Sequence, residues 1–172
     1  KRQLLAGVAT ALGGGTVRDL LLGRKVFWLA DESYLQVAVI SAIVTFFVTR
    51  IRHLPQNVFL IPDAIGLALF AIVGTQIALD WHMPWLTASL IGVITAVVGG
   101  LIRDVIINEV PLVFSSELYA TAAWIGSMTL IILVALGVES TLAAWIAMLI
   151  CIVVRLIAIR WKLTLPRFHH RA

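Results

Sequence analysis

Six apolar stretches fill most of this sequence, and each is long enough to cross or nearly cross a bilayer as a helix, which takes about 20 residues. They cover residues 4–22, 34–49, 64–79, 85–107, 118–136 and 141–159. They lack the period-two pattern of barrel strands. Only 13% of the residues are charged, against roughly 25% in a soluble domain. We therefore expect an all-α polytopic transmembrane helical bundle, forming a single domain over residues 1–172.

Basic residues in the short connecting segments predict the orientation of the bundle, because cytoplasmic loops are enriched in Lys and Arg. One side carries Lys1, Arg2, Arg50, Arg52, Arg160, Lys162, Arg167 and Arg171. On the other side, Arg24 and Lys25 are offset by Asp31 and Glu32. The first side, with the C-terminus, is expected to be cytoplasmic and to face anionic lipid. The net charge of +4 then requires no nucleic-acid partner.

The sequence contains an internal repeat: when it is aligned with itself at an offset of 85 residues, one half matches the other. The motif GGGTVRD at 13–19 meets VGGLIRD at 98–104. Further matches without a gap are Gly7 with Gly92, Thr10 with Thr95, Glu32 with Glu117, and Tyr34 with Tyr119. Three predicted spans separate the copies, so the two motif helices should cross the membrane in opposite directions. Inverted repeats of this kind are common in membrane transport proteins.

The repeat predicts how the domain is organised. The first repeat covers residues 4–62, the second covers 63–137, and 138–172 form a final helix with a basic cytoplasmic tail. The apolar stretch 64–79 precedes the second motif, whereas the first motif has no such stretch before it. We therefore expect one further N-terminal helix in the intact protein. That gives seven helices, three plus three plus one, with the N-terminus outside.

The motif residues predict a polar interior. Each glycine costs about 1 kcal/mol inside a helix, so a run of glycines predicts a kinked or broken backbone, which membranes tolerate only inside protein or beside water. An ionisable group at the bilayer centre costs at least about 2.5 kcal/mol and is a functional candidate. The predicted pore or gate residues are Thr10, Gly13, Gly14, Gly15, Thr16, Arg18, Asp19, Thr95, Gly99, Gly100, Arg103 and Asp104.

The charged residues lead to narrower expectations. Adjacent residues point about 100° apart on a helix, so the Arg of one motif is expected to pair with the Asp of the other. Arg155 is expected to extend toward the cytoplasmic face. For Asp63, Glu109 and Glu117, which sit at predicted helix ends, capping or interfacial solvation is favoured over a substrate role. A purely structural role for both motifs, with small residues packing closely and Arg–Asp pairs locking the bundle, stays open.

No catalytic, cofactor or metal site is expected. The chain has one cysteine, Cys151, and neither a Gly-x-Ser-x-Gly nor a His-Glu-x-x-His motif, so an enzyme is not predicted. The three glycines at 13–15 lack the spacing and the strand–helix context of a dinucleotide site. The expected small molecules are permeant potassium or sodium ions and bound lipid.

Three segments together resemble a known family. TALGGGTVRDLLLG at 10–23, DAIGLALFAIVGTQIAL at 63–79 and GVITAVVGGLIRDVIINEVPLV at 92–113 are similar to the prokaryotic branch of the trimeric intracellular cation (TRIC) channels, whose bacterial members are also described as glycine transporters. The resemblance implies a seven-helix protomer in the bacterial inner membrane, a homotrimer with one pore per protomer, and passive conduction of monovalent cations, chiefly potassium. The motif residues would then surround the pore constriction, with Arg18 and Arg103 neutralised by carboxylates or carbonyls.

A second function fits the same features. A secondary transporter of a small zwitterion such as glycine also uses inverted repeats and broken helices, with helix N-termini for a carboxylate and carbonyls for an ammonium group. Val98 stands where the first motif has a glycine, so a milder kink is expected in the second copy.

Overall fold

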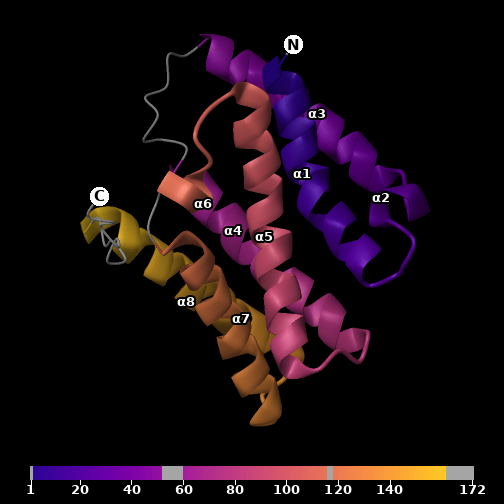
Figure 1. The fold of residues 1–172 in the computed structure, drawn as a ribbon, viewed down its shortest axis with the longest axis vertical. Helices are drawn as coiled ribbons and strands as arrows, with labels where there is room; N and C mark the ends of the chain where they lie inside the picture. Colours follow the sequence, from indigo (N-terminus) through magenta and orange to yellow (C-terminus); the bar gives the residue numbers. More distant parts are fainter. Residues whose placement is uncertain (1, 52–59, 116–117, 162–172) are drawn as a thin grey trace, which may run out of the picture.

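The computed structural model of the chain is a bundle of α-helices (Figure 1). It describes residues 2–51, 60–115 and 118–161, in which no strand occurs. The elements are α1 (Arg2–Leu21), α2 (Phe27–Ala30), α3 (Ser33–Ile51), α4 (Leu60–Asp80), α5 (Trp85–Ile107), α6 (Leu112–Ser115), α7 (Tyr119–Ala135) and α8 (Ser140–Trp161). The long helices coincide with the six predicted apolar stretches, and the all-helical fold is confirmed.

The outer surface of the bundle is apolar. By length and composition α4, α5 and α8 can cross a membrane, while Ser33–Val48 within α3 and Tyr119–Ala135 are shorter apolar helices. Large hydrophobic side chains such as Val37, Trp145 and Leu149 are exposed, as expected for a surface that faces lipid rather than water.

The bundle is centred on α1 and α5, which pack side by side (Figure 1). A Cβ atom at Gly14 would overlap the carbonyl oxygen of Thr95, and one at Gly99 would lie 2.6 Å from the carbonyl oxygen of Thr10. The shift of 85 residues relates these two contacts. Since residue numbers rise along α1 as they fall along α5, the helices are antiparallel, as an inverted repeat requires.

A break of the helices at the glycines, one of the two predicted outcomes, is wrong, whereas a kink there stays a prediction. Helix α1 is continuous through Gly13, Gly14 and Gly15, and α5 is continuous through Gly99 and Gly100. The low helix propensity of glycine is a weak preference that packing overrides. Here the missing side chains let two backbones touch instead of opening either one.

Small residues also join α4 to its neighbours. A Cβ atom at Gly92 in α5 would lie 2.6 Å from the carbonyl oxygen of Ala71 in α4. The Thr75 hydroxyl of α4 donates to the Ala71 carbonyl oxygen at 2.8 Å and lies 2.9 Å from the Ser127 hydroxyl of α7, from which it accepts, and both side chains are fully buried. Polar groups in the interior of the bundle thus bond to each other, which avoids the cost of burying them unpaired.

The glycine crossing predicts opposite outcomes for two substitutions to alanine. We expect Gly14→Ala to lower the thermal unfolding midpoint of the purified protein in detergent, because overpacking costs about 1–3 kcal/mol. Gly66→Ala in α4 is the matched control, since a Cβ atom there has nothing within 4 Å and alanine favours the helix by about 1 kcal/mol. Equal midpoints for the two variants would contradict the crossing.

Candidate functional site

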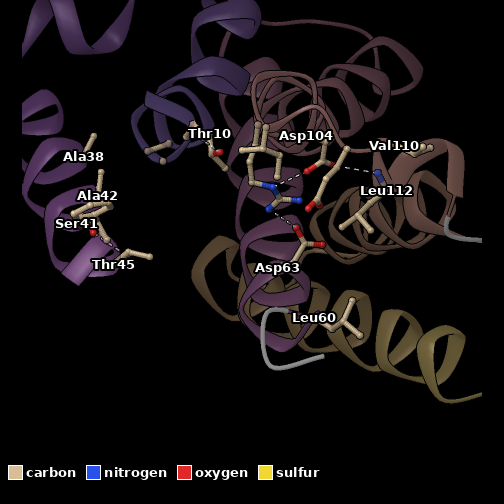
Figure 2. Close-up of a pocket in the computed structure, with 17 residues that line it drawn as sticks. Thr10, Ala38, Ser41, Ala42, Thr45, Leu60, Asp63, Asp104, Val110 and Leu112 are labelled. Carbon is tan, nitrogen blue, oxygen red and sulfur yellow. Dashed lines mark hydrogen bonds and ion pairs between the residues drawn. The ribbon is translucent and has the colours of Figure 1, made fainter. Parts of the chain in front are cut away.

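Two cavities, each open on one side of the bundle, share part of their walls. Cavity 1, of about 700 Å³, lies between α1, α3, the start of α4 and the end of α5. Cavity 2, of about 210 Å³, lies between α1, α4, α5 and α7. Both walls include Thr10, Asp63 and Arg103. These three side chains form a partition between the cavities, and Figure 2 shows Thr10 and Asp63 within the wall of cavity 1.

The partition is held by one guanidinium group between two carboxylates (Figure 2). Arg103 of α5 donates its Nε to Asp104 Oδ1 at 2.8 Å, and its Nη1 to Asp63 Oδ1 of α4 at 3.1 Å. The side chain of Arg103 is 28% exposed, whereas that of Asp63 is 8% exposed. The charge is therefore shared across two helices, at a point that water in either cavity can approach.

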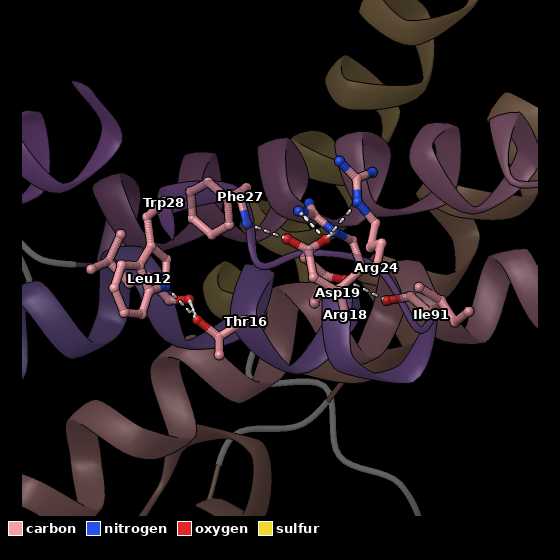
Figure 3. A network of polar contacts seen from close by, with 9 residues as sticks. Leu12, Thr16, Arg18, Asp19, Arg24, Phe27, Trp28 and Ile91 are labelled. Atoms are coloured by element: carbon pink, nitrogen blue, oxygen red, sulfur yellow. Dashed lines mark hydrogen bonds and ion pairs between the residues drawn. The ribbon is translucent and has the colours of Figure 1, made fainter. Parts of the chain in front are cut away.

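The first motif forms a tighter pair (Figure 3). Arg18 contacts Asp19 Oδ1 through Nε at 2.8 Å and through Nη2 at 2.7 Å. Asp19 is fully buried, Arg18 is 5% exposed, and the Arg18 guanidinium lies 5.6 Å from the centre of the Phe27 ring. Within the described chain, neither charge contributes to the wall of cavity 1 or cavity 2.

Each motif aspartate also fixes the turn that follows its helix. Asp19 Oδ2 accepts a hydrogen bond from the Phe27 amide at 2.7 Å, where α2 begins. Asp104 Oδ2 accepts one from the Leu112 amide at 3.0 Å, where α6 begins. The 85-residue shift relates Phe27 to Leu112 as well as Asp19 to Asp104. In each aspartate, one carboxylate oxygen thus accepts a hydrogen bond from the neighbouring arginine and the other accepts one from a backbone amide.

The expected pairing between motifs is wrong, because each Arg–Asp pair forms within its own helix. The side chain of arginine is long and flexible enough to reach the neighbouring carboxylate, so the 100° between adjacent residues is not decisive. The antiparallel crossing at Gly14 and Gly99 also places the two pairs toward opposite ends of the bundle. A contact between motifs is therefore out of reach.

The structure places the predicted pore residues in two groups. Thr10, Gly99, Gly100, Arg103 and Asp104 line cavity 1 or cavity 2. Outside the described walls of both lie Gly13, Gly14, Gly15, Thr16, Arg18, Asp19 and Thr95. Within the second group, Thr16 accepts a hydrogen bond from the Trp28 indole at 2.9 Å (Figure 3). That the twelve residues surround a pore stays a prediction.

Sequence reasoning missed three members of this site. Asp63 was favoured as a helix cap, yet it bridges to Arg103 and accepts a hydrogen bond from the Tyr119 hydroxyl at 3.4 Å. Arg155 does not extend to the cytoplasmic face: it is 1% exposed, and its guanidinium lies 4.6 Å from the centre of the Tyr119 ring. Tyr119 is the third missed residue, and its match with Tyr34 in the repeat was the signal that could have identified it. Tyr34 itself is 52% exposed.

The site consists of charged side chains beside mostly apolar walls. Among the described residues, no group of three or more His, Cys, Asp or Glu side chains could hold a metal ion. The guanidinium of Arg103 and the carboxylates of Asp63 and Asp104 lie beside mostly apolar walls. Such an arrangement suits the reversible binding of small charged species.

The two motifs predict different sensitivities to the loss of a carboxylate charge. Asp19→Asn leaves a buried Arg18, and breaking a buried pair costs about 3–5 kcal/mol. Asp104→Asn leaves Arg103 partly exposed and still paired with Asp63, so we expect a smaller loss. Thermal unfolding midpoints of both variants in detergent measure the difference. A larger loss for Asp104→Asn would show that the pairs are misassigned.

Comparisons with known proteins agree on one family. The family model described as "Glycine transporter" matches residues 3–50 and 60–135. A UPF0126 membrane protein of Vibrio cholerae is 43% identical over 168 residues, covering 96% of this chain and 70% of that protein. The UPF0126 inner membrane protein YadS of Escherichia coli K12 is 40% identical, covering 96% of this chain and 81% of that protein.

Solved structures are similar as well. A TRIC cation channel analysed for its conductance has a TM-score of 0.88 and 38% identity, covering 98% of this chain and 84% of the other. The TRIC trimeric intracellular cation channel orthologue from Rhodobacter sphaeroides has a TM-score of 0.83 and 32% identity, covering 94% of this chain and 93% of the other.

Proposed function

The chain belongs to the prokaryotic branch of the trimeric intracellular cation channel family, and on this premise we propose that it conducts monovalent cations, chiefly potassium, across the bacterial inner membrane. The observation that carries the proposal is the partition of Thr10, Asp63 and Arg103 between two cavities of one protomer. Each protomer would hold its own pathway within a homotrimer. Its small-molecule partners would be permeant potassium or sodium and membrane lipid, with no cofactor.

The geometry of Arg103 suggests how the pathway opens. The guanidinium has two carboxylate partners, Asp104 on its own helix and Asp63 on α4. If it leaves Asp63 and keeps Asp104, the charge of Arg103 stays compensated. The remaining cost is that of leaving the Asp63 carboxylate without its guanidinium, and a cation that arrives from either cavity offsets it. That movement joins cavity 1 to cavity 2 and leaves Asp63 available to a passing cation. An arginine in a cation pathway is thus a removable barrier.

Substitution of the two motif arginines tests the gate. We expect Arg103→Gln to raise the open probability in planar bilayer recordings, because the closed state loses its contact with Asp63. A partly exposed ion pair is worth about 1 kcal/mol, which corresponds to roughly a fivefold change in the ratio of open to closed channels. An unchanged open probability would overturn this role for Arg103.

Arg18→Lys is the matched control for this experiment. The substitution keeps the charge beside Asp19 and affects a pair that lies outside the described walls of both cavities. We therefore expect its open probability to match that of the unmodified protein.

Transport of a small zwitterion such as glycine is the second candidate. It is favoured by the family's description as glycine transporters, and by a partition that offers a carboxylate and a guanidinium 3.1 Å apart. An amino acid could place its ammonium group at Asp63 and its carboxylate at Arg103. Saturable glycine counterflow in proteoliposomes without single-channel currents in potassium would favour this candidate, and ohmic single-channel steps would favour the channel.

A further inference from the structure

The turns that follow the two motif helices have the same backbone. Gly23 after α1 has φ of 65° and Asn108 after α5 has φ of 62°, both in the left-handed region. The next residues, Arg24 and Glu109, donate their amides to the carbonyl oxygen of the motif aspartate five positions earlier, at 3.0 and 2.9 Å. Arg24 and Glu109 are 85 residues apart. They hold equivalent places at opposite ends of the crossed helices.

The two equivalent turns carry opposite charge. The segment RDLLLGRK at 18–25 has three basic side chains and one acidic side chain, whereas RDVIINEV at 103–110 has one basic and two acidic. Asp31 and Glu32 follow the first segment, and Asp31 accepts a hydrogen bond from the Ser33 amide at the start of α3. Within these two eight-residue segments, the inverted repeat preserves the backbone of the turn while reversing the net charge.

The acidic turn faces cavity 1. Glu109 is exposed and lines this cavity together with Asp63, Asp104 and Arg103. Among the described residues that line the cavity, three carboxylates thus face one guanidinium. A concave surface with low-dielectric walls concentrates the field of such charges and raises the local density of counter-ions.

The basic turn has different surroundings. The Arg24 side chain is 29% exposed, its Nε lies 3.6 Å from Asp19 Oδ1, and its guanidinium is 5.4 Å from the centre of the Trp81 ring. Figure 3 shows Arg24 beside Asp19 and Arg18. These contacts hold two positive charges around one carboxylate at this end of the bundle.

We infer that Glu109 selects cations at the mouth of cavity 1, and that Arg24, at the equivalent turn on the opposite membrane face, disfavours them. The consequence for transport rests on the proposed function: cations would reach the pathway more readily from the Glu109 side, and the current would rectify. Because both residues are at least partly solvated, salt should weaken the effect.

A thiol beside Glu109 measures the local charge without any need for conduction. Val110→Cys places a thiol at an exposed position that lines cavity 1. Its reaction rates with a cationic and an anionic methanethiosulfonate reagent are compared in detergent, in the presence and absence of Glu109→Gln. The unmodified protein is the blank, because its Cys151 is fully buried. Each rate is divided by the rate of the same reagent with a free thiol.

We expect Glu109→Gln to lower the ratio of the cationic rate to the anionic rate by roughly threefold in low salt, and to have little effect near 1 M salt. Arg24→Gln with the same Val110→Cys reporter is the matched control and should leave the ratio unchanged, because Arg24 lies at the other end. A ratio that is insensitive to Glu109→Gln would overturn the inference, whatever the protein transports.

Bilayer recordings in symmetric, low-concentration potassium test the consequence for transport. We expect Glu109→Gln to reduce by about twofold the current carried by cations that arrive from the Glu109 side, and Arg24→Gln to increase the current in the other direction. Conduction with rectification unchanged in Glu109→Gln would overturn the inference. No cation current in the unmodified protein, together with the expected shift in the thiol ratio, would overturn the channel and leave the charge selection by Glu109 standing.

Discussion

The structure depends on the contact between α1 and α5, in which two glycines each lie against a carbonyl oxygen of the other helix. Lipid tails are as apolar as leucine, so helices in a bilayer gain little from hiding apolar side chains and associate through close packing instead. Gly14 and Gly99 permit that approach. Because the contact is antiparallel and nearly symmetric, it also decides that the two charged motifs lie at opposite ends.

The apolar bundle can hold the charged motifs because both carboxylate oxygens of each motif aspartate accept hydrogen bonds. Its two oxygens serve different groups, one the neighbouring arginine and the other the first amide of the following short helix. The ion pair is close to neutral as a unit, and the amide supplies a further hydrogen bond, so the penalty for burying the carboxylate is reduced. The second motif differs in one respect, because Arg103 also reaches Asp63. Because of this additional contact, the ion pair of the second motif lies between the two cavities, whereas that of the first motif lines neither of them.

Much of this arrangement follows from the sequence and some of it does not. The apolar stretches predicted the long helices, and the 85-residue shift predicted that the two motif helices run in opposite directions. The short helices α2 and α6 were missed because four residues carry no periodic pattern. Asp63 was missed because a carboxylate at a predicted helix start cannot be told from a cap. The further N-terminal helix and the repeat boundaries stay predictions.

The contact between Arg155 and Tyr119 has a consequence for the symmetry of the molecule. Helix α8, which the sequence predicts to lie outside both copies of the repeat, covers the Tyr119 ring with a buried guanidinium. In the described chain the equivalent ring, Tyr34, is half exposed and meets Phe27 edge to face instead. The two matched tyrosines therefore have different partners in the described chain, a guanidinium for Tyr119 and an aromatic ring for Tyr34.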